Sequence, residues 1–283
     1  MRYVYLTVDI EEWYELDYLK EYNLKNTIVE VVPQIIDFLN MLDELNIKAT
    51  FFIVAEIAEK NADTIREIKR RGHAIGCHGY DHCLLYEKTN EQFLAEITKA
   101  KKLIEIVAKC EVDGYRAACF SMSREKLELT RKAGFLYDSS KIRFDQHPLY
   151  RNLDLTGFEQ LDDLVHRNGN FVEYEIPTLK LWKYNIPISG GGYLRLFPFF
   201  IMKRLIKMYE KSHKNFLLYV HPFELTNIKL PLPDNIGFKT KFRCLVGRKH
   251  NLRKIRKVIT FLKNQGAEFR TLTYDRKNRL GID

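Results

Sequence analysis

The stretch Gly72–His82 reads GHAIGCHGYDH, a short apolar run followed by two histidines four residues apart. Ala74–Cys77 has the length and composition of a buried strand, so His78 and His82 lie just past its carboxyl end. Two neutral imidazoles placed in this way can bind one divalent metal ion. The pair alone is a weak signal, because structural histidines share the spacing. The prediction of a metal site therefore depends on what the other strand ends carry.

Two further strand-like runs end in side chains suited to a metal hydrolase. Tyr3–Val8 is followed by Asp9 and Glu11, and Phe216–Val220 is followed by His221. Carboxylates and imidazoles at strand ends are the groups from which a mononuclear metal hydrolase is built. We therefore expect these residues to form one site with the two histidines.

Apolar runs with strand character alternate along the chain with amphipathic helical segments. Strands are expected at residues 3–8, 49–54, 74–77, 112–115, 135–137, 171–176, 216–220 and 269–272. Helices are expected at residues 33–45, 63–71, 91–108, 124–133, 198–210 and 252–263, and long polar loops at 139–170 and 226–248. The helix at 91–108 has a capping-box signature, Thr89 with Gln92 three residues later. The alternation predicts an α/β fold with a parallel sheet, closed as a barrel in a single domain over residues 1–283.

Two more polar residues fall at the carboxyl ends of predicted strands. Arg116 follows the run 112–115, and Asp138 follows the run 135–137. Barrels of this type build their active sites at that face. Scattered structural residues have no reason to gather there, so the pattern favours a shared catalytic site.

The positive charge of the chain is concentrated near its C-terminus. Lys and Arg total 46 against 37 Asp and Glu, a formal net charge of +9, and no acid occurs between Asn235 and Ala267. This stretch is either a solvated basic face or a surface for phosphates, on a substrate or on an anionic membrane. The predicted helix 252–263 should pack its apolar side on the barrel and leave its cations exposed: Arg253, Lys254, Arg256 and Lys257.

Several features bear on the location of the protein. No run of 18 apolar residues occurs, and the first residues lack the pattern of a secretory signal. Five cysteines without regular spacing do not make a disulfide framework. We expect a cytoplasmic protein with reduced thiols, with peripheral contact to the inner membrane as a further option.

Five motifs together carry a resemblance to a known family. They are a D-x-E sequence followed by an aromatic residue, an Ala-Thr-Phe-Phe strand, a Gly-His-x-Ile-Gly-x-His segment, a Gly-Gly-Gly-Tyr-x-Arg run and a His-Pro-x-Glu motif, at 9–13, 49–52, 72–78, 190–195 and 221–224. The sequence thereby resembles the polysaccharide deacetylases, the NodB-homology or carbohydrate esterase family 4 group. It is most similar to their branch in exopolysaccharide and O-antigen gene clusters. The resemblance implies a distorted (β/α) barrel of about seven parallel strands and metal-dependent removal of an N-acetyl group from a sugar.

The resemblance also implies a role for each residue of the expected site. Asp9 would be the general base, and His78 and His82 would be two metal ligands. Arg116 matches the arginine that holds the base carboxylate, and His221 matches the general acid.

The chain departs from the family pattern at two positions. Most of the family supplies the third metal ligand from the aspartate directly after the base, whereas this chain has Ile10 there. Glu11 is the nearest acid and is the expected third ligand. Ala118 stands where the family usually has a proline. Two imidazoles and one carboxylate favour zinc, and cobalt, nickel or iron also fit these ligands.

Residues for substrate binding are expected at the same face. The run Gly190–Gly192 lacks the Lys-Ser/Thr of a phosphate loop, so a tight turn lining the cleft is predicted. The candidate substrate contacts are Tyr193, Arg195, Asp138 and Glu224.

The chemistry of amide hydrolysis supports these roles without the family. A divalent ion polarises the amide carbonyl and lowers the pKa of a bound water. Asp9 can accept a proton from that water only while it is ionised, which a nearby Arg116 favours. His221 can protonate the leaving amine near neutral pH.

The sequence is compatible with three hypotheses about the function. The first is an amidohydrolase that deacetylates an amino sugar in surface-polysaccharide synthesis, with the sugar attached to a nucleotide or a polyprenyl pyrophosphate and with no role for nucleic acid. The second keeps the site but acts on another amide, in an N-formyl sugar or a ureide. The third is a non-catalytic carbohydrate- or lipid-binding barrel on a decayed hydrolase scaffold, motivated by Ile10 and Ala118.

Overall fold

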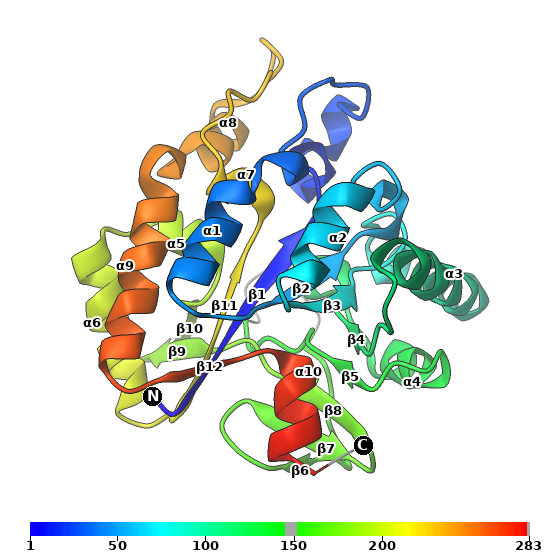
Figure 1. Ribbon diagram of the computed structural model, residues 1–283, viewed down its shortest axis with the longest axis vertical. Coiled ribbons are helices and arrows are strands. Elements are labelled where there is room, and N and C mark those ends of the chain that lie inside the picture. The colour runs from blue at the N-terminus through cyan, green and yellow to red at the C-terminus, as the bar shows by residue number, and fades with distance from the viewer. Residues whose placement is uncertain (145–151, 282–283) are drawn as a thin grey trace.

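A curled, mostly parallel β-sheet forms the centre of the molecule (Figure 1). The computed structural model describes residues 1–144 and 152–281. The strands are β1 (Tyr3–Ile10), β2 (Thr50–Ile53), β3 (Ala74–Cys77), β4 (Gly114–Tyr115), β5 (Tyr137–Asp138), β6 (Glu159–Gln160), β7 (Val165–Asn168), β8 (Phe171–Tyr174), β9 (Thr178–Leu181), β10 (Tyr184–Pro187), β11 (Asn215–Val220) and β12 (Glu268–Arg270).

The order of the strands confirms the predicted fold class. The main sheet runs β11-β1-β2-β3-β4-β5-β8-β7-β6, and β12 pairs with the start of β1. Among the strand pairings of the described residues, only those of β6 with β7 and of β7 with β8 are antiparallel in this sheet. Within the described residues, the end strands β11 and β6 do not pair with each other, so the sheet is a half-barrel and the predicted closure is wrong.

Strand β1 lies at the middle of this arrangement and is buried along all eight of its residues. A parallel strand covered on both faces requires such a continuous apolar run. Its register places Val8 beside Val220 of β11, so Asp9 and His221 follow at the same edge. The pairing of the two strands thus positions two of the expected site residues.

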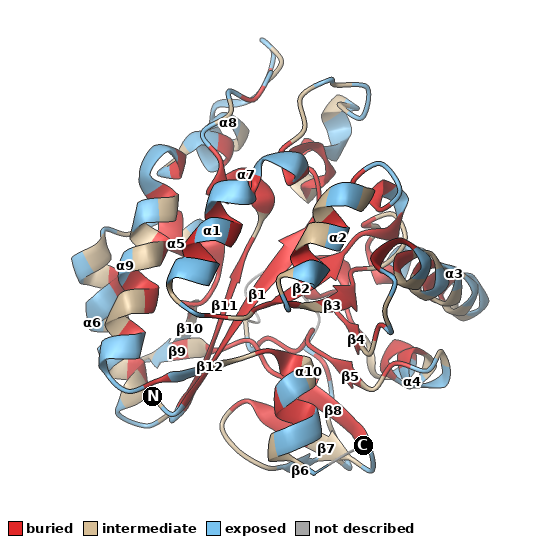
Figure 2. Cartoon of the chain, in the orientation of Figure 1, coloured by how far each residue is buried: buried red, intermediate tan, exposed pale blue. Residues whose placement is uncertain are grey.

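Helices cover the outside of the sheet and turn their polar faces to solvent (Figures 1 and 2). They are α1 (Ile36–Glu44), α2 (Ala62–Arg70), α3 (Asn90–Ala108), α4 (Arg124–Lys132), α5 (Gly191–Leu196), α6 (Phe199–Glu210), α7 (Pro222–Leu225), α8 (Phe238–Leu245), α9 (Asn251–Asn264) and α10 (Leu272–Tyr274). The capping box predicted at the start of α3 is present between Thr89 and Gln92. No described helix combines the length and the apolar character needed to cross a bilayer.

The hydrophobic core lies on both faces of the sheet. One cluster packs between the sheet and the helices and includes Leu39 of α1 and Phe51 of β2. A second, rich in aromatic residues, fills the inside of the curl, where Tyr5 and Tyr174 meet edge to face with ring centroids 5.5 Å apart. The interior is therefore a packed core, which leaves the ends of the strands as the place where a site can form.

Both predicted loops contain secondary structure. The segment 139–170 includes β6 and β7, while residues 145–151 lie outside the described part. The segment 226–248 includes α8, and a hairpin of β9 and β10 precedes α5. These elements are short, so each offers too few residues for the apolar periodicity on which the sequence prediction depends.

Candidate active site

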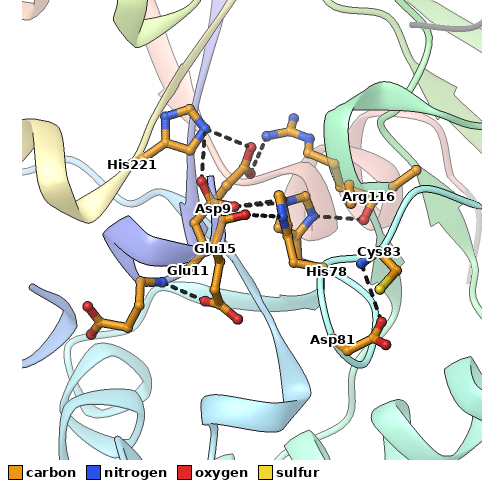
Figure 3. Close-up of polar contacts among 12 residues, drawn as sticks. Asp9, Glu11, Glu15, His78, Asp81, Cys83, Arg116 and His221 are labelled. Atoms are coloured by element: carbon orange, nitrogen blue, oxygen red, sulfur yellow. Dashed lines mark hydrogen bonds and ion pairs between the residues drawn. The ribbon is translucent and has the colours of Figure 1, made fainter. Parts of the chain in front are cut away.

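The structure brings six of the predicted residues together at one end of the sheet (Figure 3). Asp9 and Glu11 come from the end of β1, and the two histidines come from the loop after β3. Arg116 follows β4 and His221 follows β11, so four different strands supply the cluster.

Glu11, His78 and His82 form the part of the cluster that can hold a metal ion. All three are buried, and one potential ligand atom of each lies within 4.8 Å of the others. Glu11 Oε2 lies 2.6 Å from His82 Nε2 and 4.0 Å from His78 Nε2. Ile10, between the two carboxylates in sequence, points to the opposite side and belongs to the hydrophobic core.

Backbone carbonyls fix the orientation of both imidazoles. His78 Nδ1 lies 2.9 Å from the carbonyl oxygen of Arg116, and His82 Nδ1 lies 3.1 Å from that of Glu15. Because a carbonyl oxygen only accepts, each Nδ1 carries hydrogen, and in the neutral ring Nε2 presents a lone pair toward Glu11. Apart from His82 Nε2 at 2.6 Å, Glu11 Oε2 has no hydrogen-bond partner in the described residues. This donor set fits a divalent metal ion.

The electrostatics of the three residues agree with a site that attracts positive charge. Burial lowers the pKa of His78 to about 4, so this ring is neutral at pH 7. Burial also lowers the pKa of His82, but the Glu11 carboxylate outweighs it and the net shift is upward. For Glu11 itself, burial raises the pKa, while His82 and the other imidazoles lower it to about 2. A proton or a metal ion can therefore occupy the space between Glu11 and His82.

Arg116 is fully buried and holds Asp9 in place. Its Nη1 donates to Asp9 Oδ1 and to the hydroxyl of Thr7, both at 2.8 Å. Its Nε and Nη2 donate to the carbonyl and hydroxyl of Ser139, at 2.9 and 2.8 Å. Four hydrogen bonds satisfy the guanidinium, which lies 4.4 Å above the ring of Phe52. Asp9 is consequently aimed at the cluster by a rigid partner.

His221 faces the carboxylates from the opposite side of the cluster (Figure 3). Its Nε2 lies 3.9 Å from Asp9 Oδ2 and 3.7 Å from Glu11 Oε1, and its side chain is 20% exposed. Its Nδ1 lies 3.1 Å from Glu224 Oε2. Burial lowers the pKa of His221, but Glu224 and the other carboxylates outweigh it and raise the pKa to about 9. His221 is therefore protonated at neutral pH in this arrangement and can donate a proton.

The four predicted substrate contacts lie in different surroundings. Glu224 is buried and accepts from the His221 backbone N–H at 3.0 Å and from Arg195 Nε at 2.8 Å. Arg195 is also buried, and in addition to its contact with Glu224 its guanidinium donates to two backbone carbonyls. Asp138 is fully buried and accepts from the Ser140 hydroxyl. Of the four, only Tyr193 is partly exposed, whereas Arg195, Glu224 and Asp138 are buried.

The glycine run before Tyr193 also differs from the prediction. Gly191 begins helix α5 instead of a tight turn, with Gly190 as its N-terminal cap. A Cβ at Gly191 would overlap the Glu224 carboxylate, and one at Gly190 would overlap the Tyr219 ring. The glycines therefore allow the backbone to approach Glu224 closely.

Three supporting residues were not anticipated from the sequence. Thr7 and Ser139 bind Arg116, and the Glu15 carbonyl binds His82. Thr7 precedes Asp9 by two residues on one strand, so side-chain alternation could have placed both on the same face. Ser139 and Glu15 lie outside regular strands, and no sequence signal points to them.

Two family models match the chain. The first, described as polysaccharide deacetylase, matches residues 1–137, and the second, a domain of unknown function (DUF3473), matches residues 149–273. The first region supplies five of the six clustered residues and the second supplies His221. Strands of both regions belong to the same sheet.

Curated relatives match only part of the chain. A peptidoglycan-N-acetylglucosamine deacetylase of Bacillus cereus is 34% identical over 80 residues, which are 28% of this chain and 28% of that protein. A peptidoglycan deacetylase of Helicobacter pylori is 30% identical over 112 residues, which are 40% of this chain and 38% of that protein. The matched segments thus span well under half of these relatives.

Solved structures share the fold over nearly the whole chain. A carbohydrate esterase family 4 pseudoenzyme from Bacillus anthracis matches with a TM-score of 0.56 at 14% identity, over 96% of this chain and 64% of its own. A family 4 acetyl xylan esterase from Clostridium thermocellum, solved with a cobalt ion, has a TM-score of 0.56 at 15% identity, over 100% of this chain and 93% of its own. The fold is therefore that of the carbohydrate esterase family 4 barrels. Residues 1–137, just under half of the chain, therefore match the polysaccharide deacetylase family, and the chain as a whole shares the fold of the carbohydrate esterase family 4 structures.

Proposed function

We propose that this protein is a metal-dependent hydrolase that removes an N-acetyl group from an amino sugar. The observation that carries the proposal is the facing arrangement of Asp9 and His221 across a buried Glu11, His78 and His82 cluster. A base and an acid on opposite sides of one electrophilic centre are what amide hydrolysis requires. Glu11, His78 and His82 would hold the metal ion, for which zinc is the first choice and cobalt, nickel or iron are compatible.

The chain's own residues divide the proton transfers between them. Asp9 accepts the proton of the attacking water, and Arg116 keeps its carboxylate aimed at the cluster. His221 gives a proton from Nε2 to the leaving amine, because Glu224 holds its Nδ1–H. When bound, a divalent ion supplies Lewis-acid polarisation of the amide carbonyl. Glu224 and Arg195 act as positioning residues behind His221.

The proposed biological setting is surface-polysaccharide or O-antigen synthesis in the cytoplasm, by a single domain over residues 1–283. The D-x-E motif at Asp9 and Glu11 supports the assignment to that branch of the family. The sugar would be attached to a nucleotide or a polyprenyl pyrophosphate, since both are anionic handles available before export. The basic stretch between Asn235 and Ala267 supports an anionic handle or an anionic membrane as partner.

Removal of either metal-site histidine tests this function. In His78→Ala and His82→Ala, we expect loss of stoichiometric divalent metal together with at least a hundredfold loss of turnover, an order-of-magnitude expectation for a missing ligand. Metal content is measured by elemental analysis, and turnover by amine release from a panel of N-acetyl sugars, N-formyl sugars and ureides. The exposed His250→Ala is the matched control and should behave like the parent. Full activity in either ligand variant would show that the metal assignment is wrong.

A non-catalytic carbohydrate-binding barrel is the second candidate. The similarity to a family 4 pseudoenzyme, together with Ile10 at the family's usual ligand position, favours testing it. The buried charges of Asp9 and Arg116 oppose it, because a site without function has no need to maintain them. Sugar binding without turnover of any panel member, in metal-loaded protein, would support this second candidate.

A further inference from the structure

Helix α8 presents an apolar stripe to solvent. Phe238, Phe242 and Leu245 recur at i, i+4 and i+7 and are 86%, 48% and 43% exposed. Only Cys244 of this helix is buried. Large apolar side chains gathered on one exposed helix face mark an interaction surface, because removing their apolar area from water is favourable.

Cations without partners flank this stripe. The side chains of Lys239, Lys241 and Lys249 are exposed, and their ammonium groups form no hydrogen bond or ion pair within residues 1–144 and 152–281. No acidic residue lies between Asn235 and Ala267, so nothing on the helix opposes their field. An apolar stripe bordered by unpaired lysines is complementary to an anionic lipid surface, into which the rings insert while the ammonium groups stay among the headgroups.

The inner side of α8 is fixed to the active site. Arg195 donates to the carbonyls of Arg243 and Val246 at the end of the helix, and the same arginine binds Glu224 beside His221. In Figure 1, α8 lies on the side of the molecule where β11 ends and α7 begins. A surface that contacts α8 would therefore lie on the side of the sheet that carries the catalytic cluster.

A groove beside α8 adds room for a headgroup. The cavity measures about 560 Å³ and lies between the helix and the loop that follows α7. Its lining combines lysines with apolar side chains, including Lys229, Lys241, Leu230 and Leu245. Phosphate recognition by lysine next to apolar contact is the chemistry of an anionic phospholipid.

The cations of α9 are less available than the sequence suggested. Lys254 donates to the carbonyls of Leu194, Arg195 and Phe197, and Arg256 pairs with Glu44. Lys254 and Arg256 are half-buried, so the expectation that all four basic residues stay exposed is wrong. Of the four, Arg253 and Lys257 are exposed, without an exposed aromatic residue beside them on α9.

We propose that α8 docks this protein on the surface of an anionic bilayer, with Phe238 and Phe242 inserted and Lys239, Lys241 and Lys249 at the headgroups. The inference deepens the proposed function, because it assigns the membrane contact to one helix and turns the catalytic end of the sheet toward a lipid-linked sugar. Docking itself does not need turnover, so it can be tested separately.

Vesicle flotation of the full chain tests the proposal. Purified protein should float with phosphatidylcholine vesicles that contain phosphatidylglycerol, remain unbound with phosphatidylcholine alone, and be released by high salt. Phe238→Ser with Phe242→Ser, and separately Lys239→Glu with Lys241→Glu, should each weaken partitioning by about tenfold or more. Matched controls are the exposed Phe200→Ser on α6 and Arg253→Glu with Lys257→Glu on α9, which should stay within about twofold of the parent, since these residues lie outside the proposed surface.

Two results would overturn the α8 assignment. One is a parent protein that binds neither vesicle, in which case the stripe serves a protein partner. The other is an α9 variant that loses as much binding as the α8 variants while circular dichroism shows that all are folded. Vesicle binding without any deacetylation would instead count against the proposed function and leave the docking surface standing.

Discussion

At the scale of single residues, the site depends on two buried charges that have several partners each, Arg116 and Glu224. Arg116 has no exposed surface, yet Thr7, Asp9 and Ser139 accept the described hydrogen bonds of its guanidinium. Truncating any one of them would leave a buried charge unsatisfied, which costs more than the net value of the pair. Glu224 is likewise a buried charge with two partners, because its carboxylate lies between His221 and Arg195. The catalytic geometry is therefore set as much by these supporting residues as by the reacting ones.

Replacement of Glu224 by glutamine should expose its role behind His221. Glu224 contributes to raising the pKa of His221 to about 9, so its neutral replacement lowers that pKa. An acid loses activity as pH rises through its pKa, and the alkaline limb of the rate profile should therefore move to lower pH. We expect kcat to fall by roughly 10- to 100-fold with little change in KM, as for other supporting partners. The exposed Glu87→Gln serves as control, and an unshifted alkaline limb would show that Glu224 does not act through His221.

At the scale of elements, the start of helix α5 packs closely against helix α7. Gly191 begins α5 directly over the Glu224 carboxylate, and Arg195 from the end of the same helix binds that carboxylate from the side. Lys254 of α9 in turn donates to the last carbonyls of α5. Helix α5 thus packs closely on the Glu224 carboxylate of α7 and is held from behind by α9, and the close approach explains why glycine rather than a larger residue begins α5.

Two neighbouring glycines of α5 provide a matched test of this packing. A Cβ at Gly191 overlaps Glu224, whereas a Cβ at Gly192 meets nothing within 4 Å. We expect Gly191→Ala to lower the free energy of unfolding by about 1–3 kcal/mol through overpacking and to reduce turnover through displacement of Glu224. Gly192→Ala should be neutral or stabilise by up to about 1 kcal/mol, because alanine favours helix. Urea denaturation and steady-state kinetics measure both, and equal behaviour of the two variants would exclude a role for the close contact.

At the scale of the whole molecule, the sequence predicted the sheet and the site better than their connections. Long apolar runs such as β1 and amphipathic helices such as α3 carry strong periodicity, and ligand residues at strand ends follow from parallel topology. Side chains alternate along an extended strand, so Ile10 and Glu11 point to opposite sides of the sheet. This alternation supports Glu11, rather than Ile10, as the residue that points toward the metal-binding histidines. The half-open sheet and helix α8 depend on contacts distant in sequence, whereas the strands β6 and β7 are too short to leave a periodic pattern. The burial of Arg195 and Asp138 also depends on contacts distant in sequence, so no local pattern indicated it.

The stability of the fold as a whole should depend on a second pair of carboxyl groups. Asp138 and Glu173 are fully buried on neighbouring strands β5 and β8, and Asp138 Oδ1 and Glu173 Oε2 lack partners among the described residues. Burial raises the pKa of Glu173 well above its ordinary value, with Asp138 adding to the shift, and burial raises the pKa of Asp138 to about 6. A single shared proton between the two free oxygens satisfies both.

Glu173→Gln should remove the pH dependence that this pair imposes on stability. The folded state keeps the Glu173 proton to higher pH than the unfolded chain, so the folded state binds more protons above about pH 4.5 and loses stability as pH rises. Glutamine cannot ionise, keeps the acceptor for the Ser140 and Lys141 N–H groups, and can donate to Asp138 Oδ1. We expect the variant to be more stable than the parent at pH 7 by at least about 1 kcal/mol, the free energy that corresponds to roughly one pKa unit.

Urea denaturation between about pH 5 and 8 measures this difference. The free energy of unfolding of the variant should fall less steeply with pH than that of the parent or of the exposed control Glu159→Gln. A variant that is less stable at pH 7, with the parent's slope unchanged, would show that the two carboxyls do not share a proton.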